Sequence, residues 1–182
     1  MKLELKKLQY SEFASHETHC FQADIWVDGK KTLFAENDGR GGPNHYADAC
    51  TDSPRPHAEI LLLIDKIVDE HKGELKAAYG DWVKYGITDE GGSNSTLMDT
   101  LISMMIERKL NEKDLKKDLR KYVLFINEAG ELMQVKTTTR SPTEIERIRQ
   151  RENCTVILNE IPFEEAYDIV FPSTRMGDEI DA

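Results

Sequence analysis

The 182-residue chain is 39% hydrophobic and 32% charged, a composition typical of a globular protein rather than a disordered one. Lys and Arg number 24 against 34 Asp and Glu, and the formal net charge of −10 disfavours binding to nucleic acid or to an anionic membrane, because both need a basic surface. No apolar run approaches the roughly 18 residues of a membrane helix. The acidic balance fits a protein partner that carries a basic surface, or imitation of a polyanion.

Residues 1–46 are predicted to form a β-hairpin region. Alternating apolar residues predict a strand in KLELKKLQY, and two further strands flank the dipeptide Asp28-Gly29. Asp-Gly between β-rich segments favours a type I′ turn, because both turn residues adopt positive φ.

Residues 54–121 are predicted to form a helical middle region. A long helix is expected from Pro56 to a stop at Gly73, with an inward stripe of Ile60, Ile64, Ile67 and Val68 that is widened by Leu61 and Leu63. The aromatic segment YGDWVKYGITDEGGSN, which contains Tyr79, Trp82 and Tyr85, reads as an irregular crossing segment. A second helix is expected at the capping-box pattern Thr96 to Asp99, and a third at Asn111.

Residues 122–171 are predicted to follow the order ββαβα, before a frayed tail at 173–182. The hairpin turn is expected at Glu128 to Gly130, and Ser141-Pro142 with Glu144 gives the strongest helix start in the chain. A strand should follow in CTVILNEI and a short helix in PFEEAYDIVF. Strands and helices are partly segregated, so the sequence predicts a single α+β domain, residues 1–182, in which antiparallel hairpins pack on several helices.

The most distinctive stretch is the glycine-rich loop FAENDGRGGPNHY after the third strand. Glycines between a strand and a helix can hold phosphate through free N–H groups, but the loop lacks the GxGxxG and GK[ST] patterns, and Pro43 removes one donor. A partner-binding loop and an ordered surface turn are the alternatives. The candidate ligand- or partner-binding residues are Asn37, Asp38, Gly39, Arg40, Gly41, Gly42, Asn44, His45 and Tyr46.

The same region contains weak sequence signals for a metal site and for a catalytic nucleophile. His16, His19, Cys20 and Cys50 could build a zinc module, but their spacing matches no standard pattern. Cys50 with His45 and Asp48 or Asp52 could be written as a triad, although neighbours in sequence need not meet in the required geometry. We therefore expect no catalytic residue, no metal and no cofactor. Three dispersed cysteines favour reduced thiols and a cytoplasmic location.

The cationic residues gather in two places. The segment ERKLNEKDLKKDLRK alternates in sign, which is typical of a salt-bridged exposed helix face. A later group, Arg140, Arg147, Arg149 and Arg151, could meet nucleic acid or an acidic surface, but no aromatic residue accompanies it for base stacking.

Residues 11–46 resemble the opening segment of a group of small uncharacterised proteins found in bacteria, prophages and plasmids. The pattern VDGK…NDGxGG carries the resemblance, and His16 departs from it where an acidic residue is expected. The matching residues are Ser15, Glu17, Thr18, Phe21, Ala23, Val27, Asp28, Gly29, Lys30, Asn37, Asp38, Gly39, Gly41, Gly42 and Tyr46. The resemblance implies an accessory gene of a phage or mobile element and assigns no catalytic residue.

These observations favour a non-enzymatic accessory protein that binds a protein partner through an acidic surface. An inhibitor of a host defence nuclease is one concrete form, since a negative surface can occupy a nucleic-acid groove. The alternative is an enzyme or sensor that binds a nucleotide or phosphate ester through Gly39 to Gly42.

Overall fold

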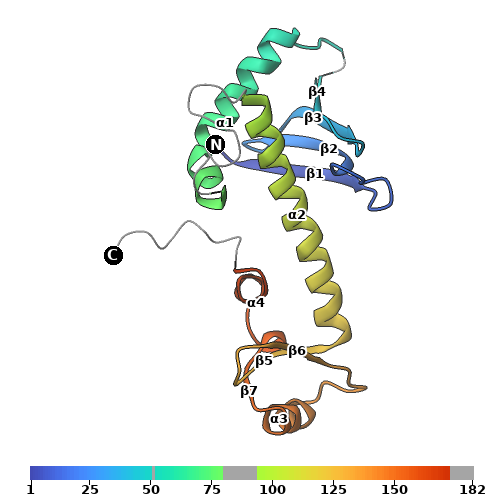
Figure 1. Ribbon diagram of the computed structural model, residues 1–182, viewed down its shortest axis with the longest axis vertical. Coiled ribbons are helices and arrows are strands. Elements are labelled where there is room, and N and C mark those ends of the chain that lie inside the picture. The colour runs from blue at the N-terminus through green and yellow to red at the C-terminus, as the bar shows by residue number, and fades with distance from the viewer. Residues whose placement is uncertain (51, 80–93, 173–182) are drawn as a thin grey trace. The chain divides into compact units, whose positions relative to one another are not determined.

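The computed structural model describes residues 1–50, 52–79 and 94–172. The chain forms two compact units, unit 1 (Met1–Glu107) and unit 2 (Arg108–Ala182). Each unit holds one antiparallel sheet together with helices, which confirms the predicted α+β class (Figure 1). That both units belong to one domain stays a prediction, and the segment around Trp82 and the tail at 173–182 lie outside the described residues.

Unit 1 contains a four-stranded sheet in the order β1-β2-β3-β4. The strands are β1 (Leu3–Tyr10), β2 (Cys20–Val27), β3 (Lys30–Asp38) and β4 (His45–Asp48), and each pairs with its sequence neighbour. The predicted turn is confirmed, because Asp28 and Gly29 have φ values of 48° and 79°. Alternation along the strands buries one face, which carries Leu5, Phe21, Ala23, Ile25, Leu33 and Ala35.

Helix α1 (His57–Tyr79) supplies much of the apolar surface of unit 1. The stripe Ile60, Ile64, Ile67 and Val68 is buried as predicted, whereas Leu61 is 40% exposed, so the expected widening of the stripe on that side is wrong. The predicted stop at Gly73 is also wrong, because α1 continues to Tyr79. Leu75 is fully buried beyond the glycine, and its burial outweighs the roughly 1 kcal/mol that glycine costs inside a helix.

Helix α2 (Asn94–Lys121) replaces two predicted helices by one. Asn111 was expected to begin a new helix but lies inside α2, and Thr96 and Asp99 lie within its first turns rather than at its boundary. Ile106 and Leu115, on either side of Asn111, are both buried, and this packing keeps the helix intact. The boundary between units 1 and 2 falls within this helix.

Unit 2 is a three-stranded sheet with an apolar cluster on each face. Its strands are β5 (Val123–Asn127), β6 (Leu132–Val135) and β7 (Cys154–Ile157), in the order β6-β5-β7. Val123 and Phe125 pack with Ile145 and Ile148 of α3 (Pro142–Arg151). The alternate residue Leu124 packs with a second cluster that contains Leu115, Leu158, and Ala166 and Tyr167 of α4 (Phe163–Val170). The predicted strand after Cys154 ends early, at a 3₁₀ turn, η2 (Leu158–Glu160).

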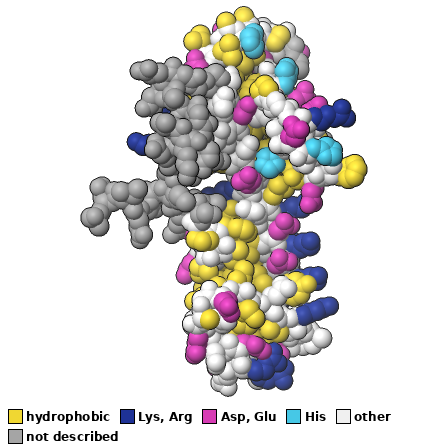
Figure 2. Space-filling view, viewed as in Figure 1, with side chains coloured by type: hydrophobic (Ala, Val, Ile, Leu, Met, Phe, Trp, Pro, Cys, Tyr) yellow, Lys and Arg dark blue, Asp and Glu magenta, His cyan; other side chains and the backbone are white. Residues whose placement is uncertain are grey.

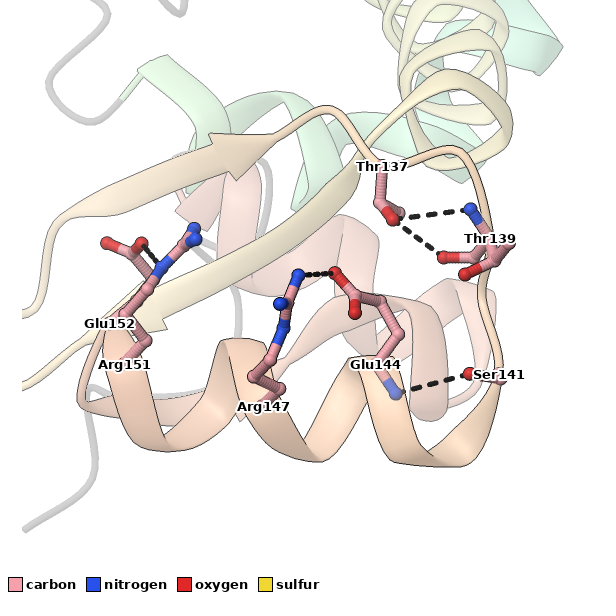
Figure 3. A network of polar contacts seen from close by, with 7 residues as sticks. All are labelled: Thr137, Thr139, Ser141, Glu144, Arg147, Arg151 and Glu152. Carbon is pink, nitrogen blue, oxygen red and sulfur yellow. Dashed lines mark hydrogen bonds and ion pairs between the residues drawn. The ribbon is translucent and has the colours of Figure 1, made fainter.

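The start of α3 follows the sequence prediction closely. The hydroxyl of Ser141 accepts the N–H of Glu144 at 3.2 Å, and Pro142 is the first helical residue (Figure 3). The α3 arginines are paired with carboxylates: Arg147 with Glu144, Arg149 with Glu146 and Glu160, and Arg151 with Glu152. These three arginines therefore lie on a neutralised helix face rather than a basic patch, whereas Arg140 donates to the carbonyl of Tyr122. No helix in the described ranges has both the length and the apolar character needed to cross a membrane.

Candidate functional site

The glycine-rich loop that joins β3 to β4 is held in place by the buried side chain of Asn37, which is 9% exposed. The Oδ1 atom accepts hydrogen bonds from Thr18 Oγ1 and from the N–H of Gly39, both at 2.8 Å. The Nδ2 atom donates to the carbonyl of Gly42 at 3.2 Å and to Asn44 Oδ1 at 3.0 Å. All four hydrogen-bonding positions of this amide are thus used, and the loop has a fixed internal frame.

Gly39 ties the loop to the connection between β1 and β2. Its carbonyl accepts the N–H groups of His16 at 2.9 Å and Glu17 at 3.0 Å. Its φ is +81°, and a Cβ atom added there would lie 2.2 Å from the carbonyl oxygen of Ala14 and 2.8 Å from Cys20 Cβ. Only glycine fits this contact, which makes the two connections one structural unit.

Helix α2 fixes the far end of the loop through Asp99. The Tyr46 hydroxyl donates to Asp99 Oδ1 at 2.7 Å, and the N–H of Asn44 donates to Oδ2 at 3.2 Å. Burial, with a further contribution from the Asp99 charge, raises the pKa of Tyr46 far above its ordinary value. Burial also raises the pKa of Asp99, although its hydrogen bonds to Tyr46 and Asn44 act in the opposite direction.

The backbone N–H groups of the loop are largely used within the protein. Gly39 donates to Asn37, Arg40 donates to Asp38 Oδ1 at 3.1 Å, and Gly41 donates to Thr18 Oγ1 at 3.3 Å. A phosphate cradle needs such groups to converge on the anion instead. The geometry therefore gives little support to the nucleotide or phosphate-ester alternative.

The nine residues predicted as one site divide into two groups. Asn37 and Gly39 are buried, and Gly41, Asn44 and Tyr46 are half-buried, so these residues hold the loop. Asp38, Arg40, Gly42 and His45 are exposed and are available for contact. His45 and Tyr46 belong to β4 rather than to the loop, because the short polar segment HYAD pairs with β3 although its own pattern is too weak to predict a strand.

A groove of about 700 Å³ crosses all four strands beside this loop. Cross-strand register places Gln9 beside Gln22, Gln22 beside Glu36, and Glu36 beside His45. Gln22 Nε2 donates to Glu36 Oε2 at 3.1 Å, and His45 Nδ1 lies 3.7 Å from Glu36 Oε1. The rest of the lining is Tyr10, Ser11, Cys20, Phe21, Asn37, Asp38, Gly41 and Pro43.

Among the residues that the structure describes, Phe13 is the most exposed large apolar side chain, with 92% of its surface accessible. It lies on the connection between β1 and β2, two residues from Ser11 of the groove and next to Ala14, which contacts Gly39. Sequence reasoning missed it, although one aromatic residue within the polar segment SEFASHETH was an available signal. An exposed aromatic ring on a fixed loop has the character of an interface anchor.

The alternative chemistries do not assemble in this region. Asp48 binds Arg55 Nε at 2.8 Å and receives the N–H of Cys50, so its carboxylate is not directed at His45 as a triad would require. The hydrogen bond from Arg55 is the main reason that the pKa of Asp48 lies well below its ordinary value. Among the described residues, no three His, Cys, Asp or Glu side chains gather in a way that could hold a metal ion, and the zinc module gains no support.

The negative charge of the chain is concentrated in unit 1. Unit 1 contains 19 acidic and 11 basic residues, a balance of −8, whereas unit 2 contains 15 and 13, a balance of −2. The space-filling view shows acidic side chains and histidines close together on the visible face of unit 1 (Figure 2). The groove therefore belongs to the strongly acidic part of the chain.

Fold and site together define an α+β protein whose acidic unit carries a loop cluster, meaning the β1–β2 connection (residues 11–19) and the predicted site segment (residues 37–46), with a groove beside it. No known protein family, curated protein or solved structure matches the chain. The resemblance carried by residues 11–46 stays a prediction.

Proposed function

We propose that this protein is a non-enzymatic binding protein that docks a protein partner with a basic surface through the loop cluster of unit 1. The observation that carries the proposal is the contrast between the two sides of this cluster. Inside, Asn37, Gly39 and Asp99 fix the backbone, and outside, Phe13, Asp38 and Arg40 are exposed.

Rigidity on the inner side favours binding because a fixed loop loses little conformational entropy when a partner docks. Phe13 supplies the apolar area that commonly dominates interface energies. The groove beside it offers two carboxylates, Glu36 and Asp38, among its lining residues. Attraction between the negative balance of unit 1 and a basic partner would speed association and weaken as the salt concentration rises.

An inhibitor of a nuclease that acts in host defence is the concrete form that we propose. Nucleases present basic grooves to the phosphate backbone, and an acidic protein that occupies such a groove competes with the nucleic acid. The accessory-gene setting implied by residues 11–46 is consistent with this role.

Affinity capture from a bacterial lysate that contains defence nucleases, followed by mass spectrometry, tests the proposal. The wild-type protein should retain a basic protein that is released by salt. Phe13→Ser should weaken this retention roughly tenfold or more, because exposed aromatic anchors carry much of the binding energy. The captured nuclease should then be inhibited by the wild-type protein in a cleavage assay and not by Phe13→Ser.

Leu62→Ser is the matched control, because Leu62 is an exposed apolar residue, 68% accessible, that lies on α1 outside the loop cluster. It should leave retention and inhibition unchanged. The proposal fails if no basic protein is retained, or if both serine variants reduce retention equally.

A further inference from the structure

Strand β6 forms one edge of the sheet in unit 2, and its hydrogen-bond phase shows which groups face outward. The N–H of Asn127 donates to the carbonyl of Glu131 at 3.1 Å, and the pairing continues from Ile126 with Leu132 to Val123 with Val135. Backbone bonds alternate in an antiparallel pair, so Met133 and Val135 direct their backbone groups to β5. Leu132 and Gln134 therefore direct their N–H and C=O groups to the open edge.

Apart from its short length of four residues, this edge lacks the features that commonly protect an edge strand. Leu132 and Met133 are 47% and 42% exposed and lie on opposite faces of the sheet. The strand contains no proline and no charged residue, and its register with β5 is unbroken, whereas the pairing of β5 with β7 shifts at Ile126 and Asn127. Within the described residues, no strand pairs with the outer edge of β6. Such an edge is a template for another strand.

We propose that the occupant of this edge is β6 of a second copy of the chain, paired antiparallel about a two-fold axis at Gln134. Antiparallel pairing places opposite residues on the same face of the sheet, so the axis passes between equivalent residues. With Gln134 opposite its own equivalent, the outward groups of both copies form two hydrogen bonds. Leu132 then lies opposite Lys136 of the second copy. By the same alternation, the backbone N–H and C=O groups of these two residues also face the open edge.

The side chains fit this register. Met133 falls opposite Val135 of the second copy at a non-hydrogen-bonded position, where cross-strand side chains lie closest, and this apolar pair occurs twice. Each strand begins after Glu131 and is followed by Lys136, so antiparallel pairing brings the negative end of one copy near the positive end of the other. No like charges stand opposite each other within the strands.

The product is a continuous six-stranded sheet in which the two copies share one ladder of backbone hydrogen bonds. A contact of this length is smaller than the roughly 1,200 Å² of a stable interface, so the dimer should dissociate on dilution. The inference is independent of the loop cluster of unit 1, and neither depends on the other.

Charge substitutions at Gln134 test the register, because only a residue on the axis meets its own equivalent. Gln134 is exposed, so Gln134→Lys and Gln134→Glu should leave the fold intact, which circular dichroism checks. Sedimentation equilibrium should show a reversible dimer for the wild type. Each variant alone should dimerise at least about fivefold more weakly, because like charges stand directly opposite. An equimolar mixture of the two should associate at least about tenfold more tightly than either variant alone.

A wild-type chain that remains monomeric at millimolar concentration overturns the inference. A dimer that neither variant weakens, or a mixture that associates no better than its components, also overturns it, because the contact then lies elsewhere or has another register.

Discussion

Tyr46 and Asp99 form a partly buried contact whose strength depends on one proton. The hydroxyl donates to the carboxylate at 2.7 Å, and its proton is retained in the folded state because burial and the Asp99 charge raise the pKa of Tyr46. The unfolded chain releases this proton near the ordinary pKa of about 10. The stabilisation of the folded state by this hydrogen bond is therefore complete below pH 10 and is lost as the pH rises further.

Tyr46→Phe should reduce the free energy of unfolding by about 2 kcal/mol at pH 7, because a hydrogen bond to a charged group is lost. Above pH 10 the difference between wild type and variant should shrink by about 1.4 kcal/mol per pH unit. Urea unfolding of both proteins between pH 7 and 11 measures it. A difference that stays constant over this range would contradict the assignment.

Gly39 and Gly42 both have a positive φ, but only Gly39 is closely surrounded by other atoms. Alanine variants at the two positions therefore distinguish the cost of backbone strain from the cost of a steric clash. Gly42→Ala should cost about 1–2 kcal/mol, because only the left-handed backbone is strained and no atom lies within 4 Å of the added Cβ. Gly39→Ala adds the clash with the Ala14 carbonyl and should cost roughly 3 kcal/mol or more. Chemical denaturation at neutral pH compares the two variants, and equal costs would show that the contact with Ala14 yields easily.

At the level of elements, local signals were predictive where a few adjacent residues decide the geometry. The Asp28-Gly29 turn and the Ser141 cap follow from short-range backbone chemistry, and both are confirmed. The predicted helix stop at Gly73 and the predicted helix start at Asn111 are wrong because burial of the next turns outweighs the weak local preference of each residue. Helix ends set by distant packing do not show in the local pattern.

Gly73→Ala tests whether packing of the later turns or the local preference of glycine decides where α1 ends. Gly73 lies inside the helix with open space around it, so alanine should stabilise the protein by about 1 kcal/mol. If Gly73 were a helix terminus in a left-handed conformation, the same change would destabilise it. The shift in the thermal unfolding midpoint gives the sign, and a lowered midpoint would favour the original expectation of a stop.

For the whole molecule, the sequence indicated the region of the candidate site but not how it is built. The sequence predicts one binding site within residues 37–46, whereas Asn37 and Gly39 face inward and Asp38 and Arg40 face outward. The partners that create this division, Thr18 and Asp99, lie 19 and 53 or more residues away along the chain. Contacts of this kind form only when the chain folds, and they produce no regular residue spacing that could be recognised in one sequence.

The carbonyl of Gly39 has a consequence for how such proteins can diversify. Because it binds the backbone of residues 16 and 17, a change of length or course in either connection displaces the other. A change in the shape of this surface should therefore require that both connections be replaced together. Grafting one of them alone onto a related scaffold would forfeit the shape of both.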